Sequence, residues 1–298
     1  MPEGPAPAPV TQRLRVRYAK RGRLRFTSHR DISRAVERAV RRAGIPVAFS
    51  AGFTPHPKIS YAGAAATGVA SEAEYLEIGL IEARDPARVR SDLDAALPAG
   101  LDIVDVVPVR QGREGDAPVK PGAFADRLEA SEWRIRLDGV AERDAAAAVA
   151  AFLGAGAIEV ERLTKKGRRR FDVRAAVSAL QAEPGELDRR AAEAADAPCA
   201  ILRMVVRHTT PAVRPDDILT GLRQVADLAP PSPPLVTRLA QGPLDADTGG
   251  LTDPLDPDRA HPGRVTEQPP GDDAGAAGGP VLPQSSGAAS ADVVSACS

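Results

Sequence analysis

Two kinds of hydrophobic spacing follow one another along residues 13–109, and their order limits the fold more than any other feature of the sequence. Residues 13–18 alternate between apolar and arginine side chains, as a half-buried strand does. Residues 29–43 repeat apolar side chains every three or four positions, which predicts an amphipathic helix. The remaining segments expected here are strands at residues 59–62, 74–80 and 101–109 and a helix at residues 85–97. Strand, helix, two strands, helix and strand, in that order, predict a ferredoxin-like domain.

A second set of patterns with a similar order follows residues 110–128, whose Gly and Pro content predicts a linker. Its segments are strands expected at residues 132–137, 158–163 and 200–208, helices expected at residues 141–153 and 216–228, and a basic turn at residues 165–170. The sequence therefore predicts an α+β chain with two tandem ferredoxin-like (βαββαβ) domains, one over residues 11–109 and one over residues 129–228.

The C-terminal part of the chain has the composition of a segment without a packed core. Residues 229–298 contain 12 Pro and 9 Gly, with nine acidic and three basic side chains. Such a segment buries too little apolar surface to offset the entropy of its chain. We expect residues 229–298 to be a disordered, Pro/Gly-rich acidic tail, and residues 1–10 to be a disordered N-terminus. The tail would either keep the protein soluble or compete with an anionic partner for its basic surface.

Positive charge is concentrated near the start of the chain. Residues 11–60 hold thirteen Arg and Lys side chains against two acidic ones, a net charge of +11 in a chain whose total is −1. Because like charges at this density repel one another, they commonly face an anionic partner. The sequence therefore predicts a polyanion-binding surface, with a merely solvated basic face as the alternative.

The helix expected at residues 29–43 separates its apolar and basic side chains on opposite faces. Only Asp31 and Glu37 are available to neutralise its arginines. The arginines of the preceding strand are expected on its exposed face. The candidate contacts from these two elements are Arg15, Arg17, Arg30, Arg34, Arg38, Arg41 and Arg42.

A loop with three prolines or glycines follows this helix at residues 51–58. Gly52 permits unusual backbone angles and the prolines limit the entropy of the loop, which can then present N–H groups to an anion. Phe53 is a candidate for stacking on a base, although burial is the alternative. The candidate RNA contacts from this region are Phe53, His56, Lys58 and Tyr61, and those from the second basic cluster are Lys165, Lys166, Arg168 and Arg169. The alternatives are a plain connecting loop and a solvated hairpin tip.

Two histidines are the candidates for catalysis. His29 at the start of the helix and His56 in the loop would act as general acid or base beside a bound phosphodiester. The chain has no Walker loop, GxGxxG or HExxH motif, and Cys199 and Cys297 have neither a metal-binding nor a disulfide spacing. We therefore expect no metal site and no cofactor bound by this chain. The absence of a signal-peptide pattern and of a long apolar run predicts a cytoplasmic protein with no membrane partner.

The segments SHRD and FSAGFTPHPKIS carry a resemblance to the bacterial radical-SAM-linked (radical-SAM-associated) protein family. The resemblance spans roughly residues 13–228 and is strongest over residues 26–80. This family is built on a domain of unknown function that occurs alone or fused C-terminal to radical-SAM enzymes. The resemblance implies a separate radical-SAM enzyme as a partner. Because this chain lacks a CxxxCxxC motif, the iron-sulfur cluster and S-adenosylmethionine are expected only in that partner.

Three hypotheses about function remain open from the sequence. The leading one is a non-catalytic accessory protein that binds tRNA or rRNA and presents it to the radical-SAM modification enzyme. The second is a metal-independent RNA endonuclease that uses His29 or His56. The third is a protein-interaction module whose arginines meet an acidic partner.

Overall fold

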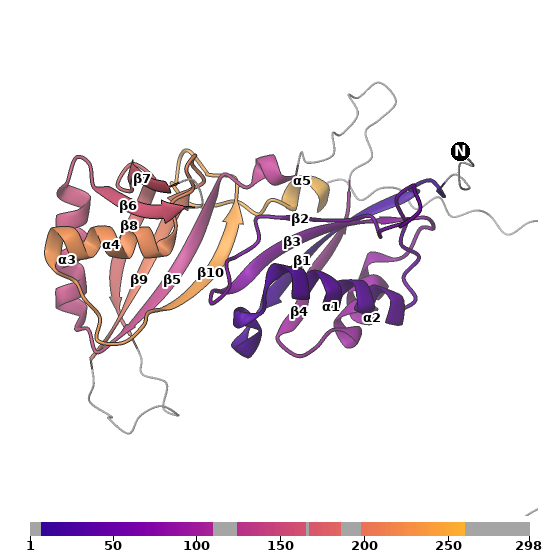
Figure 1. Cartoon of the computed structure of the whole chain (residues 1–298), viewed down its shortest axis with the longest axis horizontal. Helices are drawn as coiled ribbons and strands as arrows, with labels where there is room; N and C mark the ends of the chain where they lie inside the picture. The colour runs from indigo at the N-terminus through magenta and orange to yellow at the C-terminus, as the bar shows by residue number, and fades with distance from the viewer. Residues whose placement is uncertain (1–6, 110–123, 165–166, 186–197, 260–298) are drawn as a thin grey trace, which may run out of the picture. The chain divides into compact units, whose positions relative to one another are not determined.

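The computed structural model describes residues 7–109, 124–164, 167–185 and 198–259, which form a mixed α+β fold with a large, mostly antiparallel sheet (Figure 1). The strands of the large sheet are β1 (Gln12–Lys20), β2 (Ile59–Ala62), β3 (Ala70–Leu80), β4 (Leu101–Pro108), β5 (Ala130–Asp138), β8 (Val177–Pro184), β9 (Cys199–Arg207) and β10 (Leu235–Gly242). A separate two-stranded sheet consists of β6 (Glu159–Thr164) and β7 (Gly167–Asp172). The helices are α1 (His29–Arg42), α2 (Pro86–Ala96), α3 (Glu142–Gly154), α4 (Pro215–Ala226) and α5 (Asp256–Arg259), with short 3-10 turns η1 (Gly22–Phe26) and η2 (Ala125–Arg127).

Helix α1 confirms the prediction made from its periodicity. Its N-terminus is capped by Ser28, whose hydroxyl oxygen accepts a hydrogen bond from the Asp31 backbone N–H at 3.2 Å. Its C-terminus is followed by Gly44, which has a φ of 64° that few other residues adopt. The buried face includes Ile32, Val36 and Val40. The helix therefore presents its arginines on the side that faces away from the sheet.

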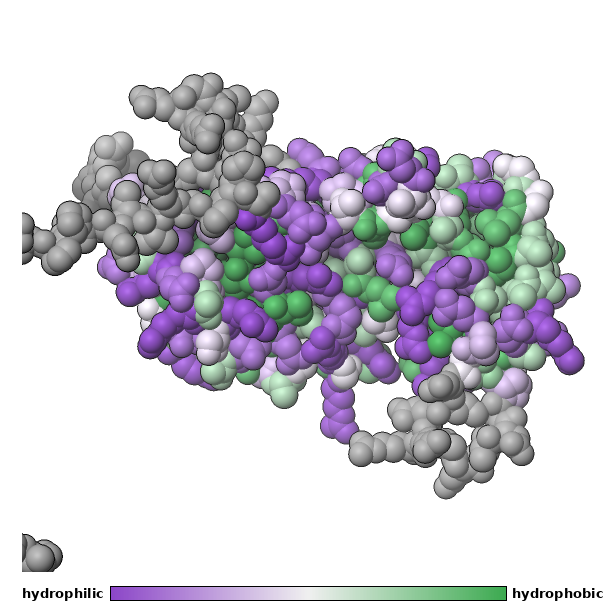
Figure 2. Space-filling view, turned by 180° about the vertical axis from the view of Figure 1, so that it is seen from behind, coloured by the Kyte–Doolittle hydropathy of each residue, from purple (hydrophilic) through white to green (hydrophobic). Residues whose placement is uncertain are grey.

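Two hydrophobic cores lie between the helices and the large sheet. Helices α1 and α2 pack on β1, β3 and β4, and helices α3 and α4 pack on β5, β8 and β9 together with β6 (Figure 1). A third, smaller cluster contains Tyr75, Phe124, Leu128 and Leu255, from β3, the region of η2 and the segment before α5. Figure 2 shows the molecule from the side opposite to that of Figure 1, where hydrophilic and hydrophobic side chains are interspersed.

Strand β10 corrects the prediction that residues 229–298 form a disordered tail. Residues 229–259 are part of the fold, and β10 pairs in parallel with β3 and antiparallel with β5. The composition of β10 did not indicate a buried strand, because its polar residues Arg238 and Gln241 are buried only through partners from distant parts of the sequence. Residues 260–298, like most of the expected linker and the expected N-terminal segment up to residue 6, lie outside the described residues.

The large sheet runs through both regions that we expected to be separate domains, so tandem ferredoxin-like domains are not confirmed. Its strand order is β4-β1-β3-β10-β5-β9-β8, with β2 also paired to β3. The hairpin of β6 and β7 forms its own sheet, and β8 was not expected from the sequence. What the structure shows is one continuous sheet with helices on it.

Buried polar groups join β1, β3 and β10 at the centre of this sheet. The guanidinium of Arg238 pairs with the Glu74 carboxylate, and the Gln241 amide donates to the Gly63 carbonyl at 3.2 Å and to the Ala73 carbonyl. The ammonium of Lys20 donates to the carbonyls of residues 65 and 66 at 3.2 and 3.1 Å. Burial lowers the pKa of Lys20, and the nearby Glu74 carboxylate opposes that shift. These groups satisfy one another and fix the position of β10.

Candidate functional site

The solvent-facing side of α1 carries a dense set of exposed arginines, which we call the α1 arginine face. Its members are Arg30, Arg34, Arg38, Arg41 and Arg42. Arg34 approaches the Asp31 carboxylate at 3.9 Å, and Arg42 donates to the Ala96 carbonyl at 3.3 Å. Within the described part of the chain, Arg30, Arg38 and Arg41 form no ion pair. The positive charge of this face is therefore largely uncompensated and open to an anionic partner.

The prediction that the arginines of β1 are exposed is wrong for Arg15 and only partly correct for Arg17. Arg15 is 1% exposed, pairs with the Asp258 carboxylate of α5, and lies 3.4 Å from the Glu77 carboxylate. Arg17 is half-buried and donates to the Glu72 carbonyl at 2.9 Å. Sequence spacing placed these arginines correctly on one side of the strand. That side is covered by a segment that the composition did not identify as folded.

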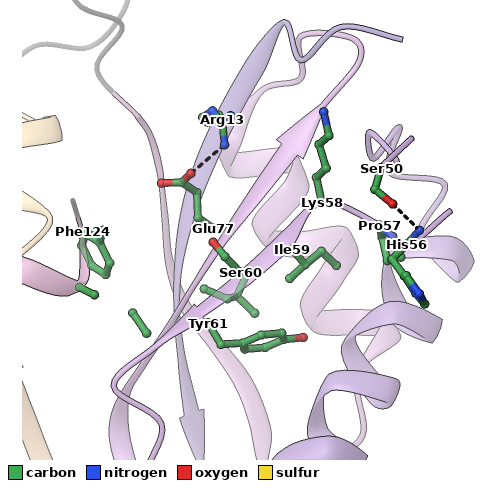
Figure 3. Close-up of a pocket in the computed structure, with 13 residues that line it drawn as sticks. Arg13, Ser50, His56, Pro57, Lys58, Ile59, Ser60, Tyr61, Glu77 and Phe124 are labelled. Carbon is green, nitrogen blue, oxygen red and sulfur yellow. Dashed lines mark hydrogen bonds and ion pairs between the residues drawn. The ribbon is translucent and has the colours of Figure 1, made fainter. Parts of the chain in front are cut away.

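A pocket of about 340 Å³ lies beside β2 (Figure 3). Its lining residues are Arg13, Ser50, His56, Pro57, Lys58, Ile59, Ser60, Tyr61, Ala62, Leu76, Glu77, Phe124 and Ala125. Residues 57–62 line it consecutively, so the pocket follows the edge of this short strand. Among the described strands β2 pairs only with β3, which leaves its other edge to the pocket.

The loop before β2 is held closed by short hydrogen bonds. The Ser50 backbone N–H donates to the His56 carbonyl at 2.8 Å, and the His56 backbone N–H donates to the Ser50 hydroxyl oxygen at 3.0 Å. This closure places His56 and Lys58 on the pocket wall and leaves Phe53, at the tip of the loop, 91% exposed. The sequence-based candidates His56, Lys58 and Tyr61 thus line one pocket, whereas Phe53 does not line it.

Tyr61 connects the pocket to α1. Its ring meets the His29 ring edge-on, with centroids 4.9 Å apart. Burial raises the pKa of Tyr61 to about 12, with the Glu37 carboxylate adding to the shift and the Ser33 hydroxyl opposing it. Since residues 29, 33 and 37 are one helical turn apart, Tyr61 lies along one side of α1. The phenol stays protonated at neutral pH and is a donor or a packing surface rather than a base.

Neither His29 nor His56 has a described hydrogen-bond partner that orients its ring. The imidazoles of His29 and His56 form no hydrogen bond with any residue that the structure describes, and so no described carboxylate orients either ring. His56 lines the pocket, whereas His29 touches it only through Tyr61. Catalysis by either residue stays a prediction.

The second basic cluster is less positive than its sequence indicates. On the β6–β7 hairpin, Arg168 pairs with Glu161 at 3.0 Å and Arg170 pairs with Glu159 at 2.7 Å. Arg169 is exposed. Lys165 and Lys166 lie outside the described residues. Cross-strand pairing with glutamates therefore neutralises part of this hairpin, which the run of basic residues alone did not indicate.

The pocket residues that were not candidates from the sequence include three polar ones, Arg13, Ser60 and Glu77. Arg13 on β1 pairs with Glu77 on β3 at 3.0 Å, and Ser60 on β2 lies directly opposite Glu77 in the sheet. The alternation of β1 and β3 gave the side on which Arg13 and Glu77 lie. Only the pairing register, which the sequence does not specify, brings Ser60 beside them.

His208 is a further histidine with a defined environment. Its Nδ1 lies 2.6 Å from the Leu128 carbonyl oxygen and its Nε2 lies 2.8 Å from the Ser131 hydroxyl. Burial of the ring lowers the pKa of His208, although part of the residue keeps contact with solvent. Because Nδ1 donates to a carbonyl, the neutral ring accepts from Ser131 at Nε2. These two bonds attach β5 to the end of β9 and give His208 a structural role.

The fold and the pocket define an α+β protein with an arginine-rich helix beside a small edge-strand pocket. Residues 13–215 match the family described as "Uncharacterized protein conserved in bacteria (DUF2344)", and the chain belongs to this family. The comparison with curated proteins gives no match. None of the helices in the described ranges is both long and apolar enough to cross a membrane.

Proposed function

We propose that this protein is an RNA-binding accessory protein. The α1 arginine face contacts the phosphates of the RNA, and the loop before β2 recognises the local structure of the same RNA. The observation that carries the proposal is the set of five exposed arginines on α1, of which only Arg34 lies near a described carboxylate. Such a face attracts a polyanion through its phosphates, independently of sequence. Phe53 adds an exposed aromatic ring of the kind that stacks on unpaired bases.

The structure changes the set of residues that we assign to RNA. Arg15 leaves it because its guanidinium is buried against Asp258. Arg17 leaves it because its guanidinium is engaged by Glu72 and lies 3.8 Å from Asp253. The five arginines of α1 remain, together with Phe53, His56, Lys58 and Tyr61. The hairpin candidates Lys165, Lys166, Arg168 and Arg169 stay predictions.

The partner in this proposal is a separate radical-SAM enzyme that would modify the presented RNA, as the family resemblance of roughly residues 13–228 implies. That enzyme would supply the iron-sulfur cluster and S-adenosylmethionine. We also infer that each half of the fold keeps a ferredoxin-like arrangement. The inference is supported by the strand orders β4-β1-β3-β2 and β10-β5-β9-β8. With the β6–β7 hairpin set aside, each half places its strands in the same order, which is last, first, third and second along the chain.

A second candidate function is metal-independent cleavage of RNA at the pocket. The position of His56 and Lys58 on one pocket wall favours it, because an imidazole and an ammonium can move a proton and stabilise a phosphorane. Incubation of RNA with the protein in EDTA tests it. Cleavage that disappears in His56→Ala supports it, and intact RNA after long incubation with folded protein removes it.

The RNA-binding proposal is tested by fluorescence polarisation with bulk tRNA, using the full chain. The test variant replaces Arg30, Arg34 and Arg38 with Gln, and the matched control replaces Arg143, Arg207 and Arg223, which are exposed on α3, β9 and α4. We expect the α1 variant to bind roughly tenfold to a hundredfold more weakly and the control to change little. Equal losses in both variants would show that α1 is not the interface.

A further inference from the structure

We propose that the pocket beside β2 receives one unpaired nucleotide of an RNA chain, with its base and ribose against the apolar wall and its phosphate near Lys58 and Arg13. The inference rests on the proposed function and adds to it a defined subsite. It assigns the ligand class of the pocket, which neither the α1 arginine face nor the family match provides.

The size of the pocket suits a single ring-bearing ligand. Its volume, about 340 Å³, lies at the lower end of the range of roughly 300–1,000 Å³ over which small organic molecules are bound. Pro57, Ile59 and Ala125 supply an apolar wall, and Phe124 and Tyr61 are the aromatic residues of the lining. A base and its ribose match this wall in size and character, whereas a duplex is too wide to enter.

The charges of the pocket favour an anion at one end. The ammonium of Lys58 is exposed and forms no ion pair with a described residue. Arg13 pairs with Glu77, but 46% of its side chain remains exposed and its guanidinium has further N–H groups to donate. Glu77 is engaged by both Arg13 and Arg15, so it does not cancel the charge of Lys58.

The pocket also holds groups that can recognise a base. Figure 3 shows Glu77 and Ser60 on the side of the strand toward Phe124, with Lys58 extending away from Tyr61. The Glu77 carboxylate can accept a hydrogen bond from an exocyclic amino group, and the Ser60 hydroxyl can donate or accept. Unpaired RNA bases are read in this way, through their edges and faces, whereas the narrow major groove of duplex RNA excludes side chains.

The neighbourhood of the pocket favours RNA over a peptide strand. The free edge of β2 would also accept an extended peptide. However, the contact of His29 with Tyr61 places the first turn of the α1 arginine face beside the pocket. Phe53 stands exposed on the loop that ends at the pocket wall. An RNA chain can meet the arginines, the pocket and Phe53 at once, which gives each feature a use.

The test is a titration of the isotope-labelled full chain, followed by NMR, with each of the four nucleoside 5′-monophosphates. Inorganic phosphate, the unphosphorylated nucleosides and a decaglutamate peptide serve as comparison probes. The variants are Lys58→Gln, which removes the free charge, and Ser60→Phe, which fills the pocket from an exposed position of β2. Retained spectra away from the pocket show that each variant is folded, and bulk tRNA binding is measured on the same samples.

We expect a nucleotide to shift the amide signals of residues 58–62. Lys58→Gln should weaken nucleotide binding by about fivefold, and Ser60→Phe should abolish it. Phosphate that binds as tightly as every nucleotide, or the peptide displacing them, would overturn the inference. Bulk tRNA binding without any nucleotide binding would overturn this inference alone and leave the proposed function standing. Nucleotide binding without tRNA binding would support the pocket and remove the proposed function.

Discussion

Replacement of Asp258 by Asn tests whether the segment before residue 260 is an integral part of the fold. Asp258 is 1% exposed, and its carboxylate pairs with Arg15 and, at 2.7 Å, with Arg127. Arg15 is equally buried, and its guanidinium stacks on the Phe124 ring at 4.7 Å. Asn keeps the shape of the side chain and removes the charge, so Asp258→Asn leaves a buried guanidinium without its closest counter-charge.

The size of the effect follows from these contacts. Breaking a buried ion pair from one side destabilises a protein by about 3–5 kcal/mol. Glu77 lies 3.4 Å from the Arg15 Nε and keeps part of the attraction, which places the expected loss near the lower limit, about 3 kcal/mol. Since folded domains are stable by about 5–15 kcal/mol, this loss is large but leaves a folded protein to measure.

Urea denaturation followed by circular dichroism measures this loss. With a slope of about 3 kcal/mol per molar urea, the midpoint of Asp258→Asn should fall by about 1 M. The control is Asp256→Asn, which removes an exposed partner of Arg259 from the same short helix and should cost less than about 1 kcal/mol. Equal midpoints for the two variants would refute the assignment of Asp258 as a buried anchor.

Three further predictions concern the fold. Burial lowers the pKa of His208 from its usual value of 6.5, so the folded state favours the neutral ring. The neutral ring therefore stabilises the fold fully above pH 6.5, and this stabilisation is lost as the pH falls below 6.5. Urea midpoints should therefore drop less between about pH 7 and pH 5 in His208→Gln than in the wild type, and an unchanged slope would contradict this role. A Cβ on Gly242 would overlap the Thr252 carbonyl, so Gly242→Ala should lose at least about 2 kcal/mol in thermal unfolding, whereas Gly154→Ala, whose Cβ meets nothing within 4 Å, should lose none. A chain that ends after Arg259 should keep its cooperative unfolding transition, whereas one that ends after Leu228 should lose it with β10, and equal transitions would contradict the central place of that strand.

Local signals predicted the elements of the first half of the chain well. Helices α1 and α2 begin close to the expected residues 29 and 85, because the side chains of Ser28 and Asp85 accept hydrogen bonds from backbone N–H groups of the turn that follows. The apolar spacing of α1 and β1 reports which side each element buries. These are short-range properties, so the sequence alone was sufficient to identify them.

The place of β10 could not be derived in the same way. Its buried Arg238 and Gln241 are stabilised by Glu74 and by carbonyls of residues 63 and 73, more than 160 residues earlier in the chain. A strand with a central arginine, after a run of prolines, has the composition of a solvated segment until its partners are known.

In the candidate site too, features set by local sequence were predicted and features set by distant contacts were not. The arginines of α1 were predicted correctly as exposed because helical periodicity fixes their side. Arg15 was not, because its cover comes from α5, which is distant in sequence. His56, Lys58 and Tyr61 line the pocket together because they are close in sequence, in a loop and the strand that follows it. The other wall, with Arg13, Glu77 and Phe124, depends on the pairing register of the strands and on the position of η2.

The salt dependence of tRNA binding by the wild type and by the Arg30, Arg34 and Arg38 to Gln variant tests the central claim most directly. The slope of log affinity against log salt counts the phosphates that the protein neutralises, at about 0.7–0.9 per contact. We predict a steep slope for the wild type, reduced by about two to three in the α1 variant and unchanged in the variant of Arg143, Arg207 and Arg223. A wild-type protein that binds no tRNA at low salt, or an α1 variant with the wild-type slope, would contradict RNA recognition by this helix.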